Sequence, residues 1–168
     1  MAKLLIFLLA WTVAVSHARV IFEDCGSLYE LDEVTIAGCD RSVPCYMTVG
    51  TSTNVTAKFL ASTHSTNLSQ TVYVRLNNVN TVTDVSPSPC ESTWCPVLTS
   101  SQASYSAFVA LPINIAIRTR GRLHWEIFNE KHERIICYEV IIETQVKAET
   151  LWSRIKDLNK MDDIPVEV

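Results

Sequence analysis

Six cysteines are the residues of this chain whose spacing most plainly indicates a chemical role: Cys25, Cys39, Cys45, Cys90, Cys95 and Cys137. In a secreted chain an even number of cysteines predicts disulfides, although spacing alone leaves their pairing open. Two pairs lie close together in the sequence, Cys39 with Cys45 and Cys90 with Cys95. If these pairs close small loops, Cys25 must pair with Cys137 across nearly the whole domain.

A zinc site is the other common use of several cysteines, and it needs thiolates in tight pairs or beside histidines. The cysteine spacings here are wider, and His64, His124 and His132 are scattered along the chain. We therefore expect three disulfides, no metal ion and no other cofactor.

Acid–base catalysis is a third chemistry to consider, because Glu23, Asp24 and His124 are suitable residue types. Nothing in the sequence fixes their relative geometry. The sequence also contains no nucleophile elbow, phosphate-binding loop or metal-binding triad. It therefore predicts a binding protein and not an enzyme.

The first eighteen residues have the pattern of a secretory signal peptide. Lys3 precedes an apolar run from Leu4 to Val15, and Ser16 and Ala18 have the spacing that a signal peptidase recognises. The run is too short to span a membrane, and a buried N-terminal helix is the alternative interpretation. We expect residues 1–18 to be removed and the mature protein to be secreted.

Two sequons, Asn54-Val55-Thr56 and Asn67-Leu68-Ser69, agree with a secretory route. They predict that Asn54 and Asn67 carry glycans and lie at the surface.

Without residues 1–18 the chain loses one basic residue, Lys3, and keeps 13 Lys and Arg against 18 Asp and Glu. This acidic balance argues against binding nucleic acid or another polyanion through bulk charge. The length fits one domain, which we place at residues 19–146 and expect to be a monomer, followed by a tail at 147–168.

Short alternating runs of apolar and polar residues fill most of the mature chain, and they predict the strands that must hold the cysteines in place. Six or seven such strands predict an all-β fold of two antiparallel sheets packed face to face. The runs are 34–36, 55–59, 72–76, 105–111, 123–127 and 136–142.

The stretch from Ile113 to Ile127 is too long for one strand, so we expect a bend near Arg118 to Gly121. Arg118, Arg120 and Arg122 share one parity there. This row is either a solvated strand face or a docking patch for an anionic lipid or a partner protein.

The tail departs from the β pattern. Leu151, Ile155 and Leu158 have helical spacing within Lys147 to Met161 and predict a short surface helix. Such a helix is either a frayed end or a contact with a partner or a membrane surface.

An ordered set of motifs spans residues 22–143. It consists of Phe22 to Ser27, Gly38-Cys39, Pro44-Cys45, Cys90, Cys95-Pro96, Tyr105-Ser106, Leu111-Pro112, Trp125 and Cys137 to Val140. With a signal peptide in front, this set resembles the ML (lipid-recognition) domain family, and within it the soluble sterol carriers of the Niemann-Pick type C class.

The resemblance implies an immunoglobulin-like β-sandwich with the pairings Cys25–Cys137, Cys39–Cys45 and Cys90–Cys95. It implies a sterol or similar hydrophobic lipid held between the sheets and handed to a membrane or a membrane-protein acceptor, either outside the cell or in the endosomal and lysosomal lumen. The lipid-binding residues that it suggests are Ile36, Met47, Phe59, Val82, Ile113, Leu123, Trp125 and Tyr138.

Two elements that shape the pocket mouth in the sterol carriers are replaced here, by Asn80 to Val85 and by Ala116-Ile117-Arg118. Two related functions therefore stay open. One is recognition of lipopolysaccharide or another lipid in innate immunity, and the other is transport of fatty acids or semiochemicals.

Overall fold

The computed structural model describes residues 19–91 and 95–147, and all regular elements within these ranges are strands. The all-β prediction is therefore confirmed for the described residues. The ten strands are β1 (Phe22–Asp24), β2 (Glu30–Ile36), β3 (Cys45–Thr48), β4 (Ser52–Leu60), β5 (Leu68–Leu76), β6 (Val79–Val82), β7 (Asp84–Ser86), β8 (Gln102–Ala110), β9 (Arg120–Asn129) and β10 (Arg134–Gln145).

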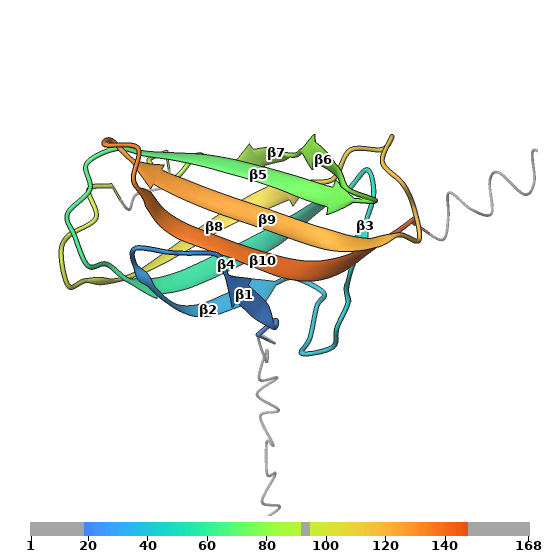
Figure 1. Cartoon of the computed structure of the whole chain (residues 1–168), viewed down its shortest axis with the longest axis horizontal. Helices are drawn as coiled ribbons and strands as arrows, with labels where there is room; N and C mark the ends of the chain where they lie inside the picture. Colours follow the sequence, from blue (N-terminus) through green and yellow to red (C-terminus); the bar gives the residue numbers. More distant parts are fainter. Residues whose placement is uncertain (1–18, 92–94, 148–168) are drawn as a thin grey trace, which may run out of the picture.

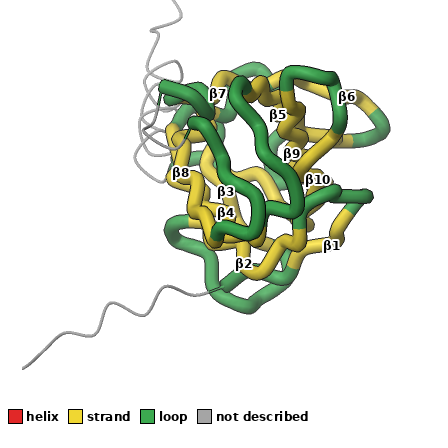
Figure 2. The backbone as a smooth tube through the Cα atoms, turned by 90° about the vertical axis from the view of Figure 1, so that its left-hand side faces the viewer, coloured by secondary structure: helices red, strands yellow, loops and turns green. Residues whose placement is uncertain are grey.

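The strands form two sheets that pack face to face as an immunoglobulin-like β-sandwich (Figures 1 and 2). One sheet has the order β1-β10-β9-β5-β6, with β3 also paired to β10, and the other has the order β2-β4-β8-β7. The neighbours are antiparallel except that β3 runs parallel to β10.

The alternation that predicted the strands also separates the core from the surface. In β4 the side chains of Val55, Ala57 and Phe59 are buried between the sheets, whereas Lys58 points outward. In β9, Leu123 and Trp125 are buried in the same core. Because each buried apolar Å² contributes about 25 cal/mol, this two-sided burial is the main source of stability.

The predicted bend before β9 is present. Arg118 has a φ of 51°, and β9 begins two residues later. Gly121 then allows β9 to approach β5 closely, because a Cβ at this position would lie 2.1 Å from the carbonyl oxygen of Arg75. The stretch from Ile113 to Arg118 is therefore a loop at one end of the sandwich.

The three disulfides join the pairs that the resemblance implies. Cys25–Cys137 ties the residue after β1 to β10. Cys39–Cys45 ties the turn after β2 to the start of β3 and thus links the two sheets. Cys90–Cys95 closes a loop between β7 and β8.

At the edge of the sandwich opposite the Cys39–Cys45 disulfide, the backbone passes from one sheet to the other. Thr83 separates β6, at the edge of the larger sheet, from β7, at the edge of the smaller one. The Thr83 N–H and hydroxyl both donate to the carbonyl oxygen of Val72 in β5. The crossing point is thereby fixed to the larger sheet.

Two expectations lie outside the described residues: the signal peptide at 1–18, and the short helix within the tail from residue 148 onward. Within the described ranges, no helix has the length and apolar character needed to cross a membrane.

Candidate lipid-binding site

The interior between the sheets contains six of the eight residues suggested as lipid-binding, and all six are buried. The smaller sheet contributes Ile36 and Phe59. The larger sheet contributes the other four, which are Met47, Leu123, Trp125 and Tyr138. The fold therefore gathers these positions at one apolar interface, where each also serves as a core residue.

Aromatic rings form the centre of this interior. Trp125 stacks on Tyr138 with ring centroids 5.9 Å apart, and it meets the edge of Tyr105 at 6.1 Å. Pattern reasoning placed Tyr105 on a strand without assigning it to the site. The indole Nε1 of Trp125 is buried and has no hydrogen-bond partner among the residues that the structure describes. A buried N–H of this kind can donate a hydrogen bond to an acceptor on a guest molecule, and leaving it unpaired costs about 1–3 kcal/mol.

Tyr105 and Tyr138 remain neutral in this interior. Burial raises the pKa of Tyr105 to about 12 and raises that of Tyr138 well above its ordinary value. The Tyr105 hydroxyl lies 2.8 Å from Gln70 Oε1 and 2.6 Å from the carbonyl oxygen of Pro87. Such an interior suits an apolar ligand better than a charged one.

Val82 and Ile113 do not lie in the interior, contrary to the expectation. Val82 is 71% exposed, because β6 places it opposite Tyr73, on the outer face of the larger sheet. Ile113 is 82% exposed, because it belongs to the loop before β9, where strand parity does not determine direction. Its side chain lies beside Gly50, whose position would place a Cβ 2.6 Å from Ile113 Cγ2.

Ile113 instead lines an apolar groove at the end of the sandwich. The groove has a volume of about 580 Å³ and is formed by Val49 to Thr51, Ile113 to Ile117, and Val146 with Lys147. Ile115 is shared between this groove and the core, against which it packs. The same loop borders a smaller hollow of about 250 Å³ beside the β5–β6 turn. Sequence patterns did not reveal this groove, because three distant loops build it.

The two sequon asparagines lie at the surface. Asn54 is half-buried on the outer face of β4, and Asn67 is exposed in the loop before β5.

The arginine row is largely neutralised by carboxylates. Arg122 contacts Glu23 at 2.7 Å and Glu139 at 2.5 Å, and Arg120 lies 4.0 Å from Glu143. Arg118 is exposed in the end loop. These ion pairs favour a solvated strand face over a patch that grips lipid phosphates.

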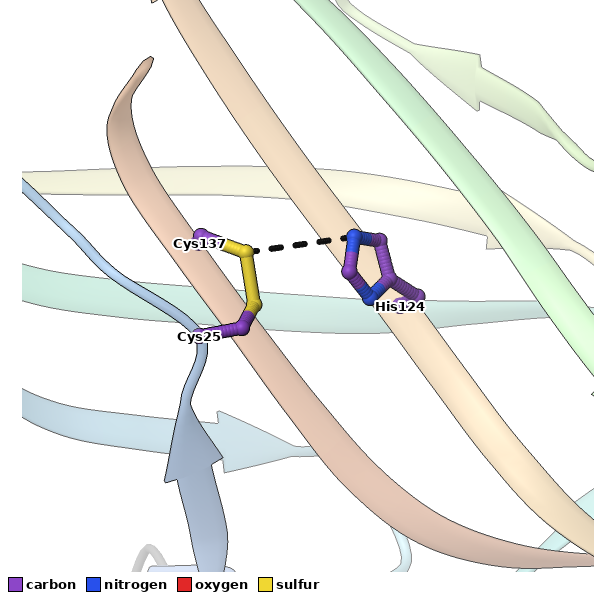
Figure 3. Close-up of side chains that lie close together, drawn as sticks. All are labelled: Cys25, His124 and Cys137. Carbon is purple, nitrogen blue, oxygen red and sulfur yellow. Dashed lines mark hydrogen bonds between the residues drawn. A yellow bond between two sulfur atoms is a disulfide. The ribbon is translucent and has the colours of Figure 1, made fainter.

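His124 lies on the outer face of the larger sheet, beside the Cys25–Cys137 disulfide (Figure 3). Its Nε2 atom is 3.8 Å from Cys137 Sγ, and the three residues offer ligand atoms within 4.8 Å of one another. The sulfurs are bonded to each other, whereas zinc binds thiolates. The imidazole therefore packs against the disulfide, and its other face stacks on Tyr73.

Glu139 connects His124 to Arg122 on the same face, with Oε1 2.9 Å from His124 Nδ1. Burial acts to raise the pKa of the Glu139 carboxyl. Its hydrogen bonds to His124 and Arg122 and the charge of Arg122 outweigh burial and lower the pKa below its ordinary value of 4.5. The unfolded chain therefore binds this proton more readily than the folded protein does.

This difference predicts a pH-dependent effect of Glu139→Gln. The stabilisation by the wild-type carboxylate is complete above pH 4.5, and it is lost as the pH falls through the lower pKa of the folded state. We expect the melting temperature of Glu139→Gln to lie below that of the wild type at pH 7 and to approach it below pH 4. Thermal unfolding from pH 7 to pH 3 measures this, with the exposed Asp32→Asn as a control. A gap that is the same at all pH values would contradict the prediction.

Comparison with known proteins places this geometry in a family. A structure of a Niemann-Pick type C2 protein from the Japanese carpenter ant is 23% identical, with a TM-score of 0.65, and the match covers 74% of this chain and 99% of that one. Chicken MD-1, solved in complex with lipid IVa, is 14% identical with a TM-score of 0.48, over 70% of this chain and 83% of its own. The ant protein supports the fold. The family model described as the ML domain matches residues 19–144, and the chain therefore belongs to the ML domain family.

Proposed function

We propose that this protein is a secreted carrier that holds a hydrophobic lipid, a sterol or a molecule of similar apolar character, between its two sheets. Membership of the ML family supports lipid recognition, and it supports binding over catalysis. The apolar, neutral interior around Trp125 and Tyr138 supports a guest that is mainly hydrocarbon. Burial of a few hundred Å² of such a guest would supply several kcal/mol without any charged contact.

The groove at the end of the sandwich is the observation that carries the proposal. Its volume of about 580 Å³ lies in the range of ligand pockets. Ile115 lines it and also packs on the core, so a displacement of the loop from Ile113 to Ile117 would connect the groove to the interior. Loading by this path, followed by release to an acceptor membrane, is the mechanism that we infer.

Two measurements test the proposal. The full chain is secreted from a eukaryotic host, and co-purified lipids are identified by mass spectrometry. The protein is then freed of lipid and titrated with a fluorescent sterol, in competition with a free fatty acid and with lipid A. We expect sterol to compete best, because Arg120 and Arg122 are already engaged by carboxylates. Tighter binding of lipid A would favour innate-immune recognition, and tighter binding of fatty acid would favour the other carrier function.

A groove variant makes the proposed path specific. Ile113→Asp places a charge on the groove wall, where apolar contact of about 1.5–3 kcal/mol is available to a passing lipid. We expect loading to slow by roughly tenfold or more. Ile21→Asp, an exposed position outside the groove lining, is the matched control and should load normally. Equal loading rates in both variants would exclude this path, and failure of the wild type to bind any lipid would exclude the carrier function.

A further inference from the structure

Asn54 and Phe108 are direct neighbours on the outer surface of the smaller sheet. The register of β4 and β8 pairs them one to one. Both point away from the core, because the adjacent residues Val55 and Val109 are buried. Side chains that are paired in this way have Cβ atoms about 4.5–5.5 Å apart and share one face.

Phe108 is an exposed aromatic ring with polar neighbours on this face. It is 50% exposed, and the next outward pairs along the two strands are Thr56 with Ser106 and Lys58 with Ser104. A single exposed apolar side chain is common in soluble proteins. This one differs because a sequon asparagine stands directly opposite it.

The hydroxyl of Thr56, the third residue of the sequon, already contacts the asparagine. Thr56 Oγ1 donates to Asn54 Oδ1 at 3.4 Å, and it lies 2.7 Å from Ser106 Oγ. The amide oxygen of Asn54 is thereby engaged, and the Nδ2 atom is the one to which an N-linked glycan would be joined.

We propose that Asn54 carries an N-linked glycan whose first sugar lays its apolar face on the ring of Phe108. In the attachment, Nδ2 forms a bond to C1 of the first sugar of a lipid-linked oligosaccharide donor. The C1–O bond to the donor's pyrophosphate breaks with its electron pair, and the proton lost from the amide leaves with the pyrophosphate. The glycan then covers the outer face of the smaller sheet, so a protein or membrane partner must approach through the larger sheet or the ends.

The proposal requires secretion and does not depend on lipid binding. To test it, the full chain is secreted from a eukaryotic host that adds oligomannose glycans, which are trimmed to a single sugar per site. Mass spectrometry of the peptide that contains Asn54 measures occupancy. Melting temperatures are compared for the wild type, Asn54→Gln, Phe108→Ser and the double variant. We expect Asn54→Gln to melt about 2–5 °C below the wild type. The double variant should melt at the same temperature as Phe108→Ser alone, because the sugar then has no ring to contact.

Two further variants make the test specific. Phe108→Tyr keeps the aromatic ring, so in this background Asn54→Gln should still lower the melting temperature. Asn67→Gln removes the other sequon, which lies outside the pairing of β5 with β9, and its effect should be the same with Phe108 or Ser at position 108. An unmodified Asn54, or a stabilisation by its sugar that persists without the ring, would overturn the proposal.

Discussion

Trp125→Ala is expected to lower the free energy of unfolding by about 3–5 kcal/mol. The side chain is 1% exposed and contacts Tyr138 and Tyr105 at the centre of the interior. Its removal leaves a cavity that the two sheets can fill only in part. Equilibrium unfolding in urea measures the change, and an unchanged dependence on urea would show that the unfolding reaction is otherwise the same.

Trp125→Phe provides the matched comparison. It keeps an aromatic ring on Tyr138 and removes the indole N–H, which has no partner within residues 19–91 and 95–147. Because loss of an unpaired buried donor relieves a cost, we expect this variant to lose at most about 2 kcal/mol. A loss as large as that of the alanine variant would contradict this account, and would indicate that the N–H is hydrogen-bonded in solution, as a bound guest would allow.

Removing the Cys25–Cys137 disulfide by a double serine substitution is expected to cost about 5 kcal/mol. The bond spans 112 residues, so its loss greatly increases the conformational freedom of the unfolded chain. The total free energy of unfolding of a natural domain is about 5–15 kcal/mol. We therefore expect poor secretion of this variant, and a large drop in melting temperature for any protein that is recovered.

The Cys90–Cys95 pair is the control for this prediction. It spans 5 residues, for which the same entropy relation gives about 2 kcal/mol. The serine double variant at this pair should remain folded and be secreted. Equal losses from the two removals would show that loop length does not determine the stabilisation, and that local contacts such as that of His124 with Cys137 are responsible.

The longer strands could be predicted because each buries one face, which leaves a period of two in the sequence. The runs with this period correspond to β4, β5, β8, β9 and β10. The short strands β1, β3, β6 and β7 have three or four residues, too few for a period to be recognised.

The inward direction of the candidate residues could be predicted where strand parity applies and not elsewhere. Trp125 lies between the polar residues His124 and Glu126, and Tyr138 shares the parity of Ile136 and Val140, so the inward direction of both side chains followed from the sequence. Val82 lies on a short edge strand whose face is decided by its pairing with Tyr73, and Ile113 lies in a loop. The groove depends on how loops far apart in the chain meet, which is a property of tertiary packing that local patterns do not encode.

The two sheets are covalently linked along both of their edges, by a disulfide on one side and by the backbone on the other. Along one long side, Cys39–Cys45 ties the end of β2 to β3, and along the opposite side the backbone at Thr83 passes directly from β6 into β7. The sheets cannot swing apart about either side as a hinge. A guest must therefore enter lengthwise through an end of the sandwich, such as the end at which Ile113 lines the groove.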